Sequence, residues 1–422
     1  MSPRRTTPTA DPAGDPAADA APAPRLQPRG SSQGGLRQYN ERVVLQAVRL
    51  HGALPAADIA RLTHLTAQTV SLISKRLLDD GLLVKGEPLR GKVGQPSVPL
   101  SLAGDGAYSV GIKVGRRSMD VLLVDFTGAV RERSSLDYRF PDPDTLLPEI
   151  GRRLAALRRS LGPARRDRVQ GVGVAAPLAI GGWQQLLGFP AALAARWEQV
   201  DLQRAVQDTS PWPVLLMKDT AAACVAELVA GQGRSVSSFL YVFVDTFVGG
   251  ALVLDSQLRP GTHGNAGALG SLPLWLSRGA HEAPPAQLLS VASLLNLEQG
   301  WAAAGLDTRA DARGQALHGA WEPLTRRWLD AAGSALAQAI NTAACLLDVD
   351  GVIVDGSCSR ELLGELMNAL HAALPRYSWE GVTAPALLPG SIGSDARALG
   401  GALLPLYAAF APDRELFLKV AR

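Results

Sequence analysis

The sequence has few cysteines, few aromatic residues and no long apolar run. Its three cysteines, Cys224, Cys345 and Cys358, are scattered through apolar segments without a CxxC pair, so neither a disulfide framework nor a zinc site is indicated. No apolar stretch is long enough to span a bilayer, and the N-terminus carries charged and proline residues where a signal peptide would be apolar. We therefore expect a cytoplasmic protein.

A strong charge imbalance is also missing, since the net charge is +3 over 422 residues. This length allows more than one domain, and a hydrophobic fraction of 47% suits a compact α/β protein. The positive charge is concentrated in residues 36–102, which hold nine Lys and Arg against five Asp and Glu. Such a segment is either a solvated surface or one that faces nucleic acid.

Large aliphatic side chains are scarce at the N-terminus. Residues 1–35 consist mainly of Pro, Ala, Asp, Arg, Ser and Gly, with Leu26 as the single large aliphatic residue. Such a segment buries too little apolar surface to fold, so we expect residues 1–35 to form a disordered tail.

Residues 54–81 predict a helix-turn-helix, because apolar side chains recur on one face of two successive helical segments. Pro55 and Asp58 fit the first turn of the first helix. Thr66 can cap the second helix, and Gly81 can end it. An earlier helix is predicted over residues 38–51. The apolar positions of the pair are Ile59, Leu62, Val70, Ile73, Leu77 and Leu78.

A β-wing is predicted after these helices, because two short apolar runs flank a basic loop rich in Gly and Pro. An ordinary packed helical hairpin is the alternative interpretation of the helices alone. The wing and the local basic excess favour a winged helix-turn-helix DNA-binding domain over residues 36–103. The side chains that we expect to contact DNA are Thr66, Gln68, Thr69, Ser71, Lys75, Arg90, Lys92 and Gln95.

Residues 104–422 predict a duplicated α/β unit. Residues 107–140 read as three strands of a meander, followed by a helix over 145–161 and an apolar strand over 169–176. A second set comes later, with strands at 238–243, 249–254 and near Leu258, a long helix over 324–347, and a buried strand at 351–354 that leads into a helix from Ser359. Two such lobes would enclose a cleft, the usual place for a small ligand.

Several segments in this order resemble the ROK family, which holds repressors and sugar kinases on a two-lobed actin-like, ribonuclease H-like fold. These segments are GIKVG and VDFTG, VQGVGVAAPLAIGG, LLMKDTAAACVAELVAG, GGALVLDSQLRPGTHGNAGALGSLPL, GVIVDGSCS and IGSDARALGGALLPL. The resemblance implies a first lobe of about residues 104–218 plus a C-terminal helix at about 393–411. The second lobe would then span about residues 219–392.

The resemblance also implies positions for kinase chemistry. The family's catalytic base matches Asp219, but the sugar-orienting Asn before it is Lys218 here. The phosphate loop that normally carries a metal-side Asp matches residues 111–117, with Lys113, Arg116 and Arg117. Asp219 can alternatively act as a structural helix-capping residue. We hypothesise that Lys113 or Lys218 neutralises Asp219 in place of the missing metal.

The sugar side departs further from the family's kinases. Positions that the resemblance assigns to a sugar-binding Glu and a zinc-binding His are Ala268 and Ser271, and another Glu position is Leu289. The zinc-binding cysteines are also missing. We therefore expect no metal, no cofactor and no enzyme activity. The side chains expected at the effector cleft are Lys113, Lys218, Asp219, Asn265, Ala268 and Ser271.

Together these features predict a DNA-binding transcriptional regulator, a repressor of carbohydrate-related genes. Its partners would be a palindromic double-stranded operator and a small effector, a sugar or a derivative, and it would act as a homodimer or higher homo-oligomer. One alternative is an active ATP-dependent sugar kinase with an added DNA-binding module. The other is a DNA-binding dimer that responds to no effector.

Overall fold

The structure is a computed structural model, and it describes residues 33–88, 98–182, 184–276 and 284–412. The chain divides into two units, Met1–Tyr39 and Asn40–Arg422. The described part of the first unit is the beginning of helix α1 (Gln33–His51). This helix starts before the predicted residue 38, so residues 33–35, which we expected in the disordered tail, are helical. The rest of that tail lies outside the described residues.

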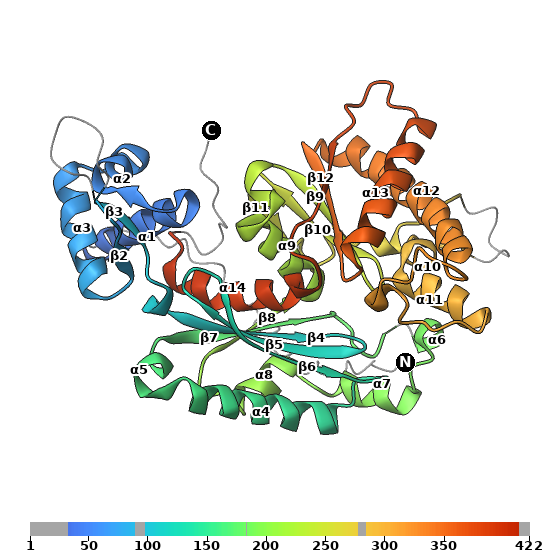
Figure 1. Cartoon of the computed structure of the whole chain (residues 1–422), viewed down its shortest axis with the longest axis horizontal. Coiled ribbons are helices and arrows are strands. Elements are labelled where there is room, and N and C mark those ends of the chain that lie inside the picture. Colours follow the sequence, from blue (N-terminus) through green and yellow to red (C-terminus); the bar gives the residue numbers. More distant parts are fainter. Residues whose placement is uncertain (1–32, 89–97, 183, 277–283, 413–422) are drawn as a thin grey trace, which may run out of the picture. The chain divides into compact units, whose positions relative to one another are not determined.

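Helices and a small antiparallel sheet follow in the second unit (Figure 1). The elements after α1 are β1 (Leu54–Pro55), α2 (Ala56–Thr63), α3 (Ala67–Asp79), β2 (Leu83–Lys85) and β3 (Pro99–Leu102). The strand order is β1-β3-β2, and β2 pairs antiparallel with β3. Apolar side chains at helical spacing fill the space between the helices. The buried ones include Val44, Val48, Ile59, Val70, Ile73 and Leu77.

Local features of this module agree with the sequence in part. Thr66 caps α3, because its Oγ1 accepts a hydrogen bond from the Thr69 N–H at 3.1 Å. Pro55 was expected within the first turn of α2, but it precedes the helix and pairs with Pro99 in β1. Leu62 was expected on the buried face, yet it is 37% exposed because it lies at the end of a short helix.

The first large sheet has the order β6-β5-β4-β7-β8, in which β6, β5 and β4 are antiparallel and β7 and β8 add in parallel. Figure 1 shows α4 running along one face of it, where its apolar side chains join the strand residues in one core. The strands are β4 (Tyr108–Val114), β5 (Ser118–Asp125), β6 (Val130–Asp137), β7 (Val169–Ala176) and β8 (Val214–Lys218). The helices are α4 (Pro143–Ser160), α5 (Gly162–Arg166), α6 (Gln184–Leu187), α7 (Ala191–Glu198) and α8 (Leu202–Gln207).

The second large sheet repeats this plan with the order β11-β10-β9-β12-β13. Again three strands form an antiparallel meander, and β12 and β13 add in parallel. The strands are β9 (Phe239–Val244), β10 (Gly249–Leu254), β11 (Gln257–Arg259), β12 (Gly351–Gly356) and β13 (Ala386–Pro389). The helices are α10 (Leu289–Ala292), α11 (Leu294–Ala303), α12 (Glu322–Leu347) and α13 (Arg360–Ala373). The repeated strand order confirms the predicted α/β fold with two lobes, and helices with a small antiparallel sheet precede them in the chain.

Two helices, α9 (Asp219–Ala230) and α14 (Ala396–Phe410), pack against each other. α14 also contacts β4 and β7 of the first sheet, and α9 contacts β10 of the second. Glycine permits this close packing, because a Cβ added to Gly173 would lie 1.8 Å from the carbonyl oxygen of Gly401. A Cβ on Gly400 would lie 1.7 Å from the carbonyl oxygen of Ala222. The glycines of the late GG motif therefore serve packing between elements.

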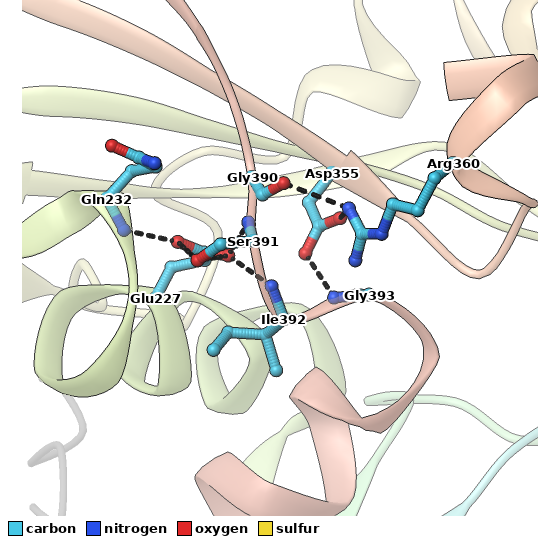
Figure 2. A network of polar contacts seen from close by, with 8 residues as sticks. All are labelled: Glu227, Gln232, Asp355, Arg360, Gly390, Ser391, Ile392 and Gly393. Carbon is cyan, nitrogen blue, oxygen red and sulfur yellow. Dashed lines mark hydrogen bonds and ion pairs between the residues drawn. The ribbon is translucent and has the colours of Figure 1, made fainter. Parts of the chain in front are cut away.

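Two buried carboxylates hold the loop that leads from β13 into α14 (Figure 2). Glu227 of α9 is fully buried, and it accepts hydrogen bonds from the backbone N–H groups of Ser391 at 2.5 Å and of Ile392 and Gln232 at 2.8 Å. Asp355 of β12 accepts the Gly393 N–H at 2.8 Å. Charge-assisted bonds of this kind fix a loop strongly. They therefore set where α14 begins.

Candidate functional site

The exposed face of α3 is the first candidate site. Gln68, Ser71 and Lys75 are exposed and lie at spacings of three and four residues, so they project from one side of the helix. Leu72 lies on the same side and is 55% exposed, although the sequence pattern did not single it out. The opposite side is buried against the module's core. This face is free to enter a major groove, as a reading helix must be.

The remaining predicted DNA contacts are less fully defined. Thr66 is exposed and Thr69 is half-buried, and their hydroxyl oxygens lie 2.8 Å apart at the start of α3. Both hydroxyls are therefore near the N-terminal end of the helix. Arg90, Lys92 and Gln95 lie outside the described residues. Their contacts with DNA stay a prediction.

The second candidate site consists of two adjoining chambers that share Arg116, Asp245, Thr246 and Arg397. We name them after one residue each. The Lys113 chamber has a volume of about 360 Å³ and the Asp219 chamber about 240 Å³. The Lys113 chamber is further lined by Arg117, Ser118, Asp120, Glu298, Asp311 and Ser357. The Asp219 chamber is further lined by Lys218, Thr220, Phe247, Asn265, Ala268, Ser271 and Leu289.

The predicted effector residues are thus divided between the chambers. Lys218, Asp219, Asn265, Ala268 and Ser271 line the Asp219 chamber together. The sixth predicted residue, Lys113, lines the Lys113 chamber and not the Asp219 chamber. The sugar-side residues implied by the resemblance therefore line the Asp219 chamber, whereas the phosphate-side residues are divided, because Arg116 lines both chambers.

A buried ion pair between Arg397 of α14 and Asp245 lies where the chambers meet. Asp245 also accepts a hydrogen bond from the Ser357 hydroxyl. Burial opposes ionisation of Asp245, but the nearby Arg397 and Lys113 hold its pKa well below the usual range. Burial would lower the pKa of Arg397, yet Asp245 and Asp219 raise it. Both partners therefore stay charged.

This arrangement corrects the hypothesis that a lysine neutralises Asp219. Lys113 Nζ lies 2.8 Å from Asp120 Oδ2 and 2.5 Å from Ser118 Oγ instead. The ion pairs of the described residues include none between Asp219 and either lysine. Arg397 is a cation that the sequence did not reveal, and the Asp219 charge acts to raise its pKa as it does those of Arg116 and Lys218. A lone Arg inside the otherwise apolar segment of α14 was the available signal, because such a charge is rarely buried without a partner.

Two arginines in the turn between β4 and β5 contact residues of the second lobe. Arg117 forms an ion pair with Glu298 of α11. Arg116 lies over the Phe247 ring at 4.9 Å, and its Nη1 donates to the carbonyl oxygens of Ile180 at 3.2 Å and Gly182 at 3.3 Å. These contacts tie the turn that resembles a phosphate loop to protein groups.

The donor groups do not fit the magnesium-nucleotide or the zinc that the resemblance associates with kinases. The metal-side carboxylate that the resemblance associates with residues 111–117 is missing, and the Lys113 ammonium in that segment cannot ligate a cation. Ala268 and Ser271 offer no imidazole or thiolate to zinc. Asp219, the position of the family's base, accepts a hydrogen bond from the Thr220 N–H at 2.8 Å, so its carboxylate satisfies a helix-start donor. These residues therefore support no chemical step through either group.

Comparison with known proteins places this architecture among regulators and kinases. A model of the ROK family matches residues 109–407. The xylose repressor of Bacillus subtilis is 22% identical over 248 residues, which cover 58% of this chain and 62% of the repressor. That alignment therefore leaves more than a third of the repressor unmatched.

Solved structures share the fold. The crystal structure of a ROK family transcriptional regulator, a homologue of the Escherichia coli MLC protein, is 20% identical with a TM-score of 0.66, covering 90% of this chain and 98% of that one. The ROK hexokinase of Thermus thermophilus is 23% identical with a TM-score of 0.53, covering 70% of this chain and 97% of that one. In the part of the chain that the structure describes, no helix is long and apolar enough to cross a membrane. Because the family model spans well over half of the 422 residues, this protein belongs to the ROK family.

Proposed function

We propose that this protein is a DNA-binding transcriptional regulator, a repressor of carbohydrate-related genes, whose cleft binds a small effector. The winged helix-turn-helix would read the operator with the exposed face of α3 and the wing. The effector, a sugar or a derivative, would bind in the Asp219 chamber. It would act by favouring one arrangement of the lobes over another.

The observation that carries this proposal is that charged side chains on the phosphate side of the cleft are already paired with one another. Arg397 and Asp245 pair where the two chambers meet, and Lys113 pairs with Asp120. A kinase needs charged groups there that are available to a metal-nucleotide. The sugar-side residues line the Asp219 chamber, of about 240 Å³. A cleft that can hold a ligand without phosphorylating it suits a sensor attached to a DNA-reading module.

The relatives support the same proposal. The Bacillus subtilis protein is named a xylose repressor, and the MLC homologue is named a transcriptional regulator. A winged helix alone binds DNA weakly, so we propose a homodimer on a palindromic operator with half-sites about 34 Å, or a multiple, apart. Genome-wide binding in cells would identify that operator and the neighbouring genes.

The test of DNA binding uses Lys75→Gln in the full chain on the operator so identified. Removal of one phosphate contact should weaken binding and reduce the slope of log K against log salt by about 1 per module. Arg259→Gln removes an exposed cation from β11, far along the sequence from α3, and serves as the matched control. Equal affinity and slope for Lys75→Gln and the control would contradict the predicted contact.

A sugar kinase with an added DNA-binding module is the second candidate function. It is favoured by the acid at Asp219 and by the likeness to a ROK hexokinase. Coupled ADP release with a panel of hexoses separates the two functions. We expect no sugar-dependent turnover, and turnover that Asp219→Ala abolishes would replace the regulator proposal. A regulator without an effector would instead show unchanged operator affinity with every small molecule.

A further inference from the structure

The charges of the Asp219 chamber do not cancel. Arg397 and Asp245 form an ion pair and neutralise each other. The remaining charged side chains of the chamber are Arg116, Lys218 and Asp219, two cations and one carboxylate. The chamber therefore retains a positive charge in a confined space, where electrostatic attraction is stronger than in water.

Both remaining cations are held without a carboxylate at ion-pair distance among the described residues. Arg116 is fixed by two carbonyl oxygens and the Phe247 ring, so its orientation is set before any ligand arrives. Burial lowers the pKa of Lys218, and the Asp219 charge opposes that shift. An anion placed between the two cations would offset this burial cost.

The first turn of α9 adds donors to the same place. Lys218 is the N-cap of this helix and makes no side-chain cap bond, and Thr220 follows in the first turn. The Thr220 hydroxyl is buried with no hydrogen-bond partner among the described residues, and Thr220 lines the chamber. A helix N-terminus attracts anions, and a buried hydroxyl without a partner is costly. Both features suit an acceptor oxygen from a ligand.

The rest of the chamber offers acceptors and apolar surface. Asp219 and Asn265 can accept hydrogen bonds from hydroxyl groups. Leu178, Phe247 and Leu289 add apolar wall. The volume of about 240 Å³ is close to the lower end of ligand pockets, about 300 Å³. This favours a ligand of monosaccharide size.

From these observations we infer that the Asp219 chamber binds an acidic monosaccharide derivative, with its carboxylate or phosphate between Arg116 and Lys218 and without a metal ion. The hydroxyl groups of the ligand face Asp219 and Asn265. This inference rests on the proposed effector function and names its ligand class. Neither cation needs a bridging metal, because each can donate directly to anionic oxygens.

The requirement for both cations locates the anion. Lys218 also lines a neighbouring hollow of about 630 Å³ with Trp197, and Arg116 also lines the Lys113 chamber. Of these three hollows, the Asp219 chamber is the one lined by both side chains. A ligand that depends equally on both must therefore lie in that chamber.

Calorimetry on the full chain without DNA tests the inference with glucose, glucose 6-phosphate, glucuronate and inorganic phosphate as probes. We expect an acidic sugar to bind more tightly than glucose, with affinity that falls as salt rises and is unchanged by EDTA. The phosphate and carboxylate sugars distinguish the two sources of the anionic group. Arg116→Gln and Lys218→Gln should each weaken acidic-sugar binding roughly tenfold or more, and by a larger factor than they weaken glucose binding.

Conservative variants and a surface control complete the design. Arg116→Lys and Lys218→Arg keep the charge and should recover most of the affinity, which separates charge from folding defects. Arg259→Gln should leave all affinities unchanged. Preference for glucose, loss of affinity in only one of the two Gln variants, or no binding of any acidic probe at millimolar concentration would overturn the inference. Operator binding is measured separately, so a chain that binds DNA but prefers glucose keeps the proposed function and loses only this ligand class.

Discussion

Removing the charge of Asp245 should destabilise the protein, because it leaves Arg397 buried without its partner. The side chain of Arg397 is 6% exposed and that of Asp245 is 19% exposed. Breaking a buried pair by removing one charge costs about 3–5 kcal/mol. Asp245→Asn retains an oxygen for the Ser357 hydroxyl, and both chambers admit water. We therefore expect the lower end, a loss of about 3 kcal/mol in unfolding free energy.

Urea denaturation at pH 7, followed by circular dichroism and tryptophan fluorescence, measures this loss. Arg397→Met should cost a similar amount, and the Asp245→Asn/Arg397→Met double variant should recover about 2 kcal/mol relative to additivity. Asp137→Asn, at an exposed position on β6, should change stability by less than about 0.5 kcal/mol. A similarly small effect of Asp245→Asn, or strict additivity in the double variant, would refute the ion pair as a stabilising element.

Three further predictions concern pH, the loop into α14 and helix packing. Because the pKa of Asp245 is lowered on folding, the Asp245 carboxylate contributes its full stabilisation above about pH 4, and this stabilisation is lost as the pH falls below that value. In urea titrations at decreasing pH, the difference in unfolding free energy between wild type and Asp245→Asn should therefore shrink. Glu227→Gln places an amide opposite backbone N–H donors and should cost about 2 kcal/mol, seen as a lower Tm; an unchanged Tm would contradict the role of its charge. Gly173→Ala should prevent stable folding, since its Cβ would lie 1.8 Å from the Gly401 oxygen, and soluble, cooperatively unfolding protein would disprove this.

Most of the secondary structure was predictable, because the apolar periodicity of each element agrees with its burial. The strand predicted over 169–176 is β7 (Val169–Ala176), and the helix predicted from Ser359 begins with Ser359 as N-cap of α13. The duplicated strand order was also predictable, since two meanders and two apolar strands recur in the same sequence order. Local pattern is sufficient wherever an element buries one face against its immediate neighbours.

Other elements could not be predicted, because distant parts of the chain create them. β1 (Leu54–Pro55) exists because it pairs with Pro99 and Leu100, more than forty positions later in the chain. The short helices α6, α7 and α8 contain too few turns for a clear apolar period. Helix α1 starts at Gln33 within a segment whose composition predicts disorder. In each case the local sequence pattern does not contain the information that determines whether the element forms or where it begins.

The pairing of charges in the cleft could not be predicted from local sequence patterns either. The resemblance implied that the phosphate loop lacks its metal-side Asp and contains Lys113. It did not imply that the Lys113 charge would lower the pKa of Asp245, more than a hundred residues later, or that Arg397 would pair with that aspartate. The Asp120 and Asp245 carboxylates of the cleft are thus partnered by Lys113 and Arg397. Removing one partner of such a buried pair costs about 3–5 kcal/mol, so a ligand that displaced Arg397 from Asp245 would have to offset a cost of that order. An acidic monosaccharide bound between Arg116 and Lys218, as we propose, would leave that pair intact and avoid this cost.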